Sequence, residues 1–218
     1  MSIDSSGVLP DSIADQLRAS ILSQQDAPGS AITESAVALR FGVARPTARI
    51  AIERLVADGL LRREAHHAAR VPELSRDDIV DLFDNRSIIE SAAMAALARS
   101  GTIPAEALTA HRAIGSDDGR FAEHDIDFHR SLVAGQPSPR LTRMHSLLIG
   151  EIQLCIGQVQ AAQLMTPLEV AAQHQGILDA ITAGDSAEAA RLTRLHIASS
   201  RDALLAHVDL SPHDKDTP

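Results

Sequence analysis

Six segments with apolar residues at helical spacing follow one another from residue 76 to residue 208. Breakers rich in Gly and Pro, such as residues 101–104 and 135–139, separate consecutive segments. Connections this short join antiparallel neighbours, so residues 76–210 are predicted to fold as an antiparallel all-helical bundle. The six helices are predicted over residues 76–100, 104–115, 119–134, 138–163, 167–183 and 186–208.

The chain before this run has a different pattern. Helices are predicted over residues 11–24, 34–41 and 46–57. Residues 60–63 and 69–71 are short enough to be the two strands of a hairpin, and residues 1–9, which show no period, are expected to be a loose tail. This order is that of a winged helix-turn-helix. The chain is therefore predicted to be mainly α, with a DNA-binding domain at 10–72 and a helical domain at 76–210.

The overall charge and the single cysteine restrict where such a chain acts. Its 218 residues carry a net charge of −9, which argues against indiscriminate binding to nucleic acid. Cys155 has no partner for an intramolecular disulfide. The longest apolar runs fall far short of the roughly 18 residues that cross a bilayer. We therefore expect a cytoplasmic protein with no role in a membrane.

A basic patch interrupts this acidic background within residues 40–70. Seven arginines stand there against three acidic residues, which gives a local net charge of +4. Arg45 and Arg49 are four residues apart, so they project from one face near the start of the third predicted helix. Thr47 lies between them and is predicted to contact DNA with them.

The side chains of this patch have the chemistry for reading DNA. An arginine fork can pair with O6 and N7 of guanine, so Arg45 and Arg49 are predicted to contact bases. Arg40, at the end of the preceding helix, is predicted to hold a phosphate. His66 or His67, at the hairpin tip, is expected to reach the minor groove. A single arginine pair on a helix is more often a solvated face, but the tight turn before this pair favours DNA binding.

Two short stretches carry a resemblance to a known family. Phe41-Gly42-Val43-Ala44-Arg45 with Arg49, and then Asp58-Gly59-Leu60-Leu61, match in order and spacing the winged helix-turn-helix of the GntR family of bacterial transcription regulators. The resemblance covers residues 10–71 and implies that Arg45 and Arg49 contact bases of double-stranded operator DNA. Ala44 stands where the family usually has a capping serine, a loss of about 1 kcal/mol of helix stability.

The helical domain contains residues with metal-ligating chemistry. Asp125 and His129 are four residues apart, so a carboxylate and an imidazole meet over one helical turn. His174 and His196 lie on two other predicted helices among apolar neighbours. If these helices surround one cavity, an aspartate and three histidines converge and leave open positions for water or a ligand. Each histidine taken alone is more often a packed or surface residue.

Residues 77–208 resemble the FCD effector-binding domain of the FadR branch of GntR regulators. Arg86-Ser87-Ile88-Ile89-Glu90 is similar to the opening helix of that domain, and Asp125 with His129 is similar to its most recognisable signature. Six helices resemble the VanR-type subgroup. The resemblance implies that a divalent transition metal, Zn, Ni or Mn, is held by four residues: Asp125, His129, His174 and His196.

The two resemblances together imply a DNA-binding transcription regulator rather than an enzyme. A small organic acid, of the carboxylate class, is expected to bind at the metal, with Arg86 as a charged clamp. An ion pair between Arg86 and Glu90 is the equally weighted alternative for that arginine. A homodimer on a palindromic operator is expected. The alternatives are a metal-dependent hydrolase and a metal-free helical interaction module.

Overall fold

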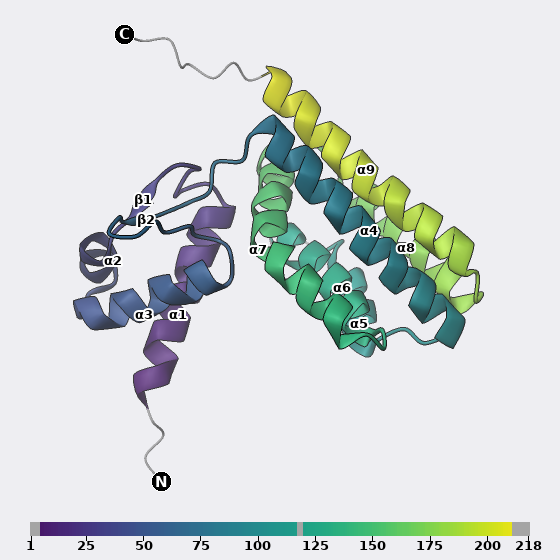
Figure 1. Cartoon of the computed structure of the whole chain (residues 1–218), viewed down its shortest axis with the longest axis horizontal. Helices are drawn as coiled ribbons and strands as arrows, with labels where there is room; N and C mark the ends of the chain where they lie inside the picture. The colour runs from purple at the N-terminus through teal and green to yellow at the C-terminus, as the bar shows by residue number, and fades with distance from the viewer. Residues whose placement is uncertain (1–4, 117–119, 211–218) are drawn as a thin grey trace.

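The computed structural model describes residues 5–116 and 120–210, which form two lobes (Figure 1). We call the first lobe the head and the second the bundle. The head contains α1 (Ser5–Leu22), β1 (Ala31–Ile32), α2 (Glu34–Phe41), α3 (Arg45–Ala57) and β2 (Ala69–Arg70). The bundle contains α4 (Arg76–Ser100), α5 (Ala105–Ala113), α6 (Phe121–Gly135), α7 (Pro139–Ala161), α8 (Pro167–Thr182) and α9 (Ser186–Leu210). The predicted mainly α fold, with a winged head ahead of a helical bundle, is confirmed.

The two central helices of the head begin and end where the sequence predicts. The Thr33 side chain accepts a hydrogen bond from the Ala36 N–H at 3.1 Å and caps α2, which ends at Gly42 with a φ of 65°. Ala44 precedes α3 and makes no side-chain cap, as its side chain requires, and Pro46 fixes the first turn. The tight turn between α2 and α3 therefore places Arg45 at the start of the second helix.

The wing differs from the predicted hairpin. β2 is present, but it pairs antiparallel with β1, which the sequence did not predict, in the register Ala31↔Arg70. Residues 60–63 contribute a single bridge, Arg62↔Arg70, so the prediction of a strand there is wrong. Leu60 and Leu61 are both buried in the core of the head, whereas a half-buried strand would alternate between its two faces.

The first helix begins earlier than predicted. α1 starts at Ser5, so the expectation of a loose tail is wrong for residues 5–9, whereas residues 1–4 lie outside the described part of the chain. Pro10 is inside the helix, where it removes one backbone hydrogen bond near the N-terminal end. The expected loop residues 117–119 and the C-terminal residues 211–218 also lie outside the described residues.

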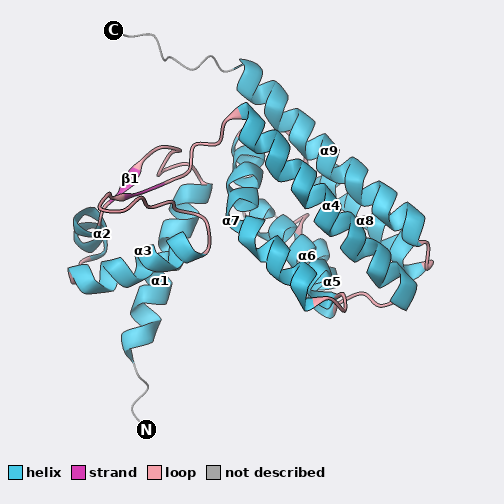
Figure 2. Cartoon of the chain, in the orientation of Figure 1, coloured by secondary structure: helices cyan, strands magenta, loops and turns pink. Residues whose placement is uncertain are grey.

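The bundle is built around α4, which packs along the length of α9 and also contacts α6, α7 and α8 (Figure 2). Ser75 and Asp78 form a reciprocal capping box at its start, and Gly101, with a φ of 65°, ends it. Because α6, α8 and α9 approach one another around α4, side chains from separate helices meet in the middle of the bundle. No helix in the described part of the chain combines the length and the apolar character that crossing a bilayer requires.

The head and the bundle touch through α7. Gly150 lies against the backbone at the end of α3, and Gly157 lies against the last turn of α1. Leu154, between these glycines, packs in the hydrophobic core of the head. Arg62 and Glu151 form an ion pair at 2.5 Å across the same contact. The absence of side chains at the two glycines therefore lets the head approach α7 at backbone distance.

We expect Gly150→Ala to destabilise the protein by about 1–3 kcal/mol. A Cβ at residue 150 would overlap the carbonyl oxygen of Asp58, and this backbone atom cannot move aside as a flexible side chain can. Urea unfolding measures the change. Gly176→Ala is the matched control, since Gly176 is also helical and its Cβ would meet only Leu192 Cδ1 at 3.6 Å. A Gly150→Ala protein as stable as the control would contradict the close packing.

Candidate functional site

Four predicted ligands from three helices converge in the middle of the bundle. Asp125 and His129 come from α6, His174 from α8 and His196 from α9, and all four are buried. Nε2 of His196 lies 3.0 Å from Nε2 of His129 and 3.4 Å from Nε2 of His174. Oδ1 of Asp125 lies 3.3 Å from Nε2 of His174 and 4.0 Å from Nε2 of His129. The convergence on which the sequence interpretation depended is therefore present.

These separations suit ligands that share one cation. Nitrogen and oxygen ligands bind a first-row metal at about 2.1 Å, so adjacent ligands of a tetrahedral or octahedral site lie about 3.0–3.4 Å apart. Three of the four distances fall in that range, and the fourth approaches the value for ligands on opposite sides of an ion. The residues present therefore fit a divalent transition metal, with Asp125 supplying the only carboxylate among the four.

The surrounding side chains orient the histidine rings. Nδ1 of His196 lies 2.7 Å from Oε1 of Gln173, and Nδ1 of His129 lies 2.6 Å from Oε2 of Glu90. The ring of His174 stacks on Phe128 at 3.8 Å between centroids and 12° between planes. Each ring is thus held so that its Nε2 faces the same point.

Burial sets the protonation of the site. Desolvation lowers the pKa of His174 to about 4, against the opposing effect of Asp125, and lowers the pKa of His196 well below its usual value. Burial by itself raises the pKa of Asp125, but hydrogen bonding to His174 and the neighbouring histidines hold it below the usual value. Near pH 7 the site therefore offers a carboxylate and neutral imidazoles, which are the forms that bind metals.

Acid is expected to destabilise the metal-free protein before its carboxylates titrate. His174 has a pKa of about 4 in the folded chain and 6.5 in the unfolded chain, so the unfolded chain binds more protons between these values. The free energy of unfolding should fall as the pH drops from 6.5 to 4, by up to about 3 kcal/mol. Urea unfolding in chelator at pH 7, 6 and 5 measures this slope. His174→Asn should flatten it, whereas substitution of exposed His207 should not.

Arg86 is placed beside this cluster and is completely buried. Its Nε donates a hydrogen bond to Oε1 of Glu90 at 2.8 Å, so the ion pair that the sequence allows is formed. Within the described residues, Nη1 and Nη2 of Arg86 and Oδ2 of Asp125 have no hydrogen-bond partner. A buried guanidinium with two unsatisfied nitrogens is costly, and an anionic ligand would satisfy both of them.

The predicted base-reading side chains project from the start of α3. Arg45 is its first residue and is exposed, and Thr47 is half-buried. The side chain of Arg49 is 66% exposed and lies 3.9 Å from Glu34 and 3.8 Å from Glu53. Neither distance is that of a tight hydrogen bond, so both arginines are available to a ligand outside the head.

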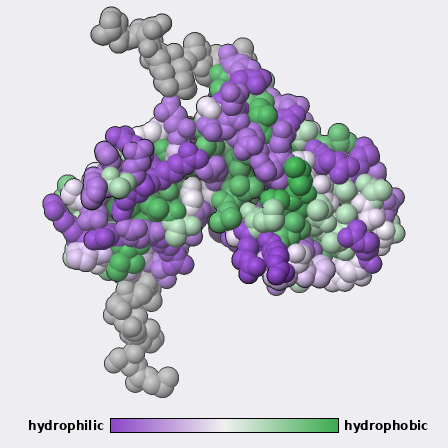
Figure 3. Space-filling model, viewed as in Figure 1, coloured by the Kyte–Doolittle hydropathy of each residue, from purple (hydrophilic) through white to green (hydrophobic). Residues whose placement is uncertain are grey.

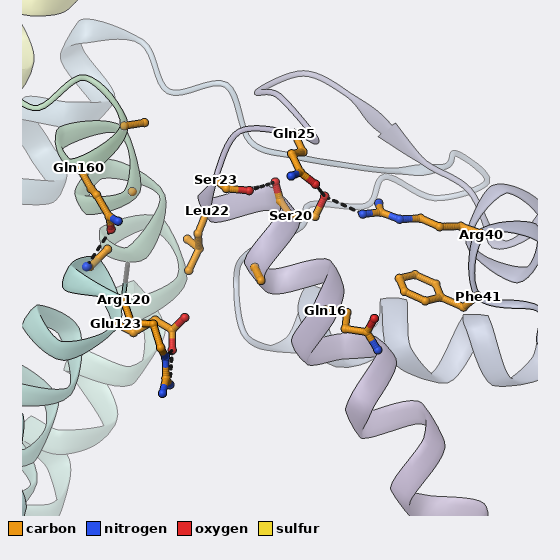
Figure 4. A pocket seen from close by; sticks show the side chains of 14 residues that line it. Gln16, Ser20, Leu22, Ser23, Gln25, Arg40, Phe41, Arg120, Glu123 and Gln160 are labelled. Carbon is orange, nitrogen blue, oxygen red and sulfur yellow. Dashed lines mark hydrogen bonds and ion pairs between the residues drawn. The ribbon is translucent and has the colours of Figure 1, made fainter. Parts of the chain in front are cut away.

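Arg40 and His67 are placed differently from that pair. Arg40 points toward α1, where it donates hydrogen bonds to Asp26 and Ser20, both at 2.9 Å. It lines a cavity of about 830 Å³ between the head and the bundle, with Phe41, Arg120 and Glu123 among the other lining residues (Figure 4). His67 is exposed in the wing, with Nδ1 2.9 Å from the Ala65 carbonyl oxygen. Both remain predicted DNA contacts.

Three residues near the site were not singled out by the sequence interpretation. Glu90 was considered only as the ion-pair partner of Arg86, His145 was interpreted as a packed or surface residue, and Gln173 was passed over. Only Glu90 had a usable signal, because it is a charged residue four positions after Arg86 in a largely apolar stretch. The contacts of His145 with Glu90 and of Gln173 with His196 join separate helices, which spacing along the chain does not reveal.

The fold and the side chains described above define a class of protein, a winged-helix transcription regulator with a helical sensing domain. The profile described as "Bacterial regulatory proteins, gntR family" matches residues 9–71, and that of the FCD domain matches residues 81–199. The chain belongs to the GntR family of bacterial transcription regulators and carries an FCD effector-binding domain.

Known relatives agree with this assignment. A probable D-xylose utilization operon transcriptional repressor of Paenarthrobacter nicotinovorans is 29% identical over 78% of this chain and 77% of its own length. The transcriptional repressor NanR of Enterobacter sp. (strain 638) is 27% identical over 88% of this chain and 83% of its own length. These relatives are regulators of transcription and not enzymes.

A solved structure shares the fold. The GntR regulator from Rhodococcus sp. RHA1 has a TM-score of 0.72 and 22% identity, over 90% of this chain and 97% of its own.

Proposed function

We propose that this regulator binds a small carboxylate at a metal held by Asp125, His129, His174 and His196, and that this binding controls its affinity for operator DNA. The observation that carries the proposal is the convergence of four buried ligand atoms in the described bundle. A bound metal would act as a Lewis acid that attracts the carboxylate. The unsatisfied nitrogens of Arg86 supply a second, charged contact for the same ligand.

The packing around the cluster gives the ligand a way to act on the head. The cavity beside Asp125 and His196 has a volume of only about 10 Å³, which is room for about one water molecule. A carboxylate must therefore displace neighbouring side chains to enter. The N–H of Ala122, in the first turn of α6, donates to Gln160 of α7, and α7 contacts the head. A ligand that favours one packing of α6 against α7 would thereby favour one placement of the head.

A titration with simple carboxylates tests the proposal. Metal-loaded protein on an operator fragment, followed by fluorescence anisotropy, should change its DNA affinity with acetate, lactate or citrate. Arg86→Gln should weaken that response by about 10- to 100-fold, since a hydrogen bond to a charged group contributes about 1.5–3 kcal/mol. Arg99→Gln, which changes an exposed arginine of the same helix, is the matched control. A response equally strong in Arg86→Gln would contradict the proposed clamp.

We also propose that the protein acts as a homodimer in the cytoplasm, where its operator would be found. Ile88 of α4 and Met144 and Leu147 of α7 are large apolar residues that are more than half exposed. Apolar surface covers parts of α4 and α7 on the face shown in Figure 3. A second copy would bury such surface and place two heads on the half-sites of a palindrome. A monomer in sedimentation velocity at micromolar concentration would contradict this assignment.

A further inference from the structure

The carboxylate of Glu90, which is completely buried in α4, touches both the predicted effector arginine and a predicted metal ligand. Its Oε1 accepts a hydrogen bond from Nε of Arg86 at 2.8 Å and lies 3.1 Å from Nε2 of His145. Its Oε2 lies 2.6 Å from Nδ1 of His129. Among the described residues, neither Oε2 nor this Nδ1 has another hydrogen-bond partner. The two atoms therefore have only each other.

This pairing determines which ring nitrogen of His129 carries a proton. An ionised carboxylate accepts hydrogen bonds and cannot donate them, so Nδ1 of His129 must be the donor. The neutral ring then has a bare lone pair at Nε2, the atom that lies 3.0 Å from Nε2 of His196. A proton on Nε2 would instead occupy the position that a metal needs.

The three histidines of the cluster differ in this respect. His196 has the neutral amide oxygen of Gln173 beside its Nδ1, and within the described residues the Nδ1 of His174 has no partner. Only His129 is paired with a carboxylate on the side away from the cluster. Its orientation therefore depends on a charged group that also binds Arg86.

We infer that Glu90 is a positioning residue, which holds His129 with its proton on Nδ1 so that Nε2 faces the metal, and which connects this ligand to Arg86. The inference rests on the metal site proposed above. Glu90 does not face the ligand cluster itself, because its two oxygens are occupied by Arg86, His145 and His129. It acts on the metal through His129.

Glu90→Gln tests this role because an amide has one donor and one acceptor end. The oxygen of the amide should turn toward the cationic Arg86, which leaves its NH₂ group facing Nδ1 of His129. Nδ1 must then accept, and the ring proton moves to Nε2. We expect Zn²⁺ affinity, measured by competition with a chromophoric chelator, to fall about 10- to 100-fold. Long-range ¹H–¹⁵N spectra of the metal-free protein should show that Nδ1 of His129 has lost its proton.

His145→Gln is the matched control. It keeps a donor for Oε1 of Glu90 and changes a residue outside the ligand cluster, so both measurements should stay at their wild-type values. A Glu90→Gln protein with an unchanged ring proton and unchanged Zn²⁺ affinity would overturn the inference. Should this variant fail to fold, the wild-type spectrum decides, because a bare Nδ1 in His129 overturns it directly. A wild-type protein that has the Nδ1 proton but binds no Zn²⁺, Ni²⁺ or Mn²⁺ contradicts the proposed metal site and supports the placement of His129 by Glu90.

Discussion

Removal of metal with a chelator is expected to lower the free energy of unfolding of this regulator by about 4 kcal/mol, relative to protein in a thousandfold excess of free metal over its Kd. The stabilisation arises because Asp125, His129, His174 and His196 form one site in the folded bundle and lie on separate segments of the unfolded chain. Calorimetry with EDTA, and then with Zn²⁺, Ni²⁺ or Mn²⁺, measures the shift. The metal with the largest effect identifies the preferred ion.

Two substitutions make this result specific to the cluster. His174→Ala removes a ligand and should abolish most of the difference between chelated and metal-loaded protein. His207→Ala removes an exposed histidine of α9 and should preserve it. Identical melting curves with and without metal, in protein purified without a histidine tag, would mean that the four side chains only pack. The metal-free interaction module would then be the better description of the bundle.

The sequence predicts the parts of this fold that local chemistry determines. The cap at Thr33, Gly42 at the end of α2, and Pro46 in α3 each act within one or two turns, and the helix-turn-helix follows from them. β1 was missed because a strand of two residues has no period of its own. It is defined by pairing with Ala69–Arg70, which lie almost forty residues further along the chain.

The candidate site divides in the same way. The spacing of Asp125 and His129 places them on one helical turn, and no tertiary information is needed for that step. The approach of His174 and His196 to this pair depends on how α8 and α9 pack against α6, so residue spacing could state it only as a condition. The family resemblance supplied the set, and the structure brings it together. The contact of Glu90 with His129 had neither source.

Arg49→Ala is expected to weaken operator binding more than any other single substitution in the head. Each good arginine contact with guanine contributes about 1–3 kcal/mol of discrimination. A homodimer on a palindrome would lose the contact twice, so the cost is about 2–6 kcal/mol. Discrimination should relax at one base pair of each half-site, and anisotropy titrations with operators changed at single positions measure both effects. Arg45→Ala should relax a different base pair.

Arg40→Ala separates base reading from phosphate binding. A phosphate contact carries no sequence information, so this variant should weaken all sequences alike and lower the salt dependence by about one per contact. Asp26 already pairs with Arg40, so a phosphate gains less there than at an unpaired arginine, and the loss should be smaller than for Arg49. Arg99→Ala, in the bundle, should change neither quantity. Wild-type affinity in both Arg40→Ala and Arg49→Ala would mean that a different face of the head enters the groove, because no arginine of α3 could then be reading bases as assigned.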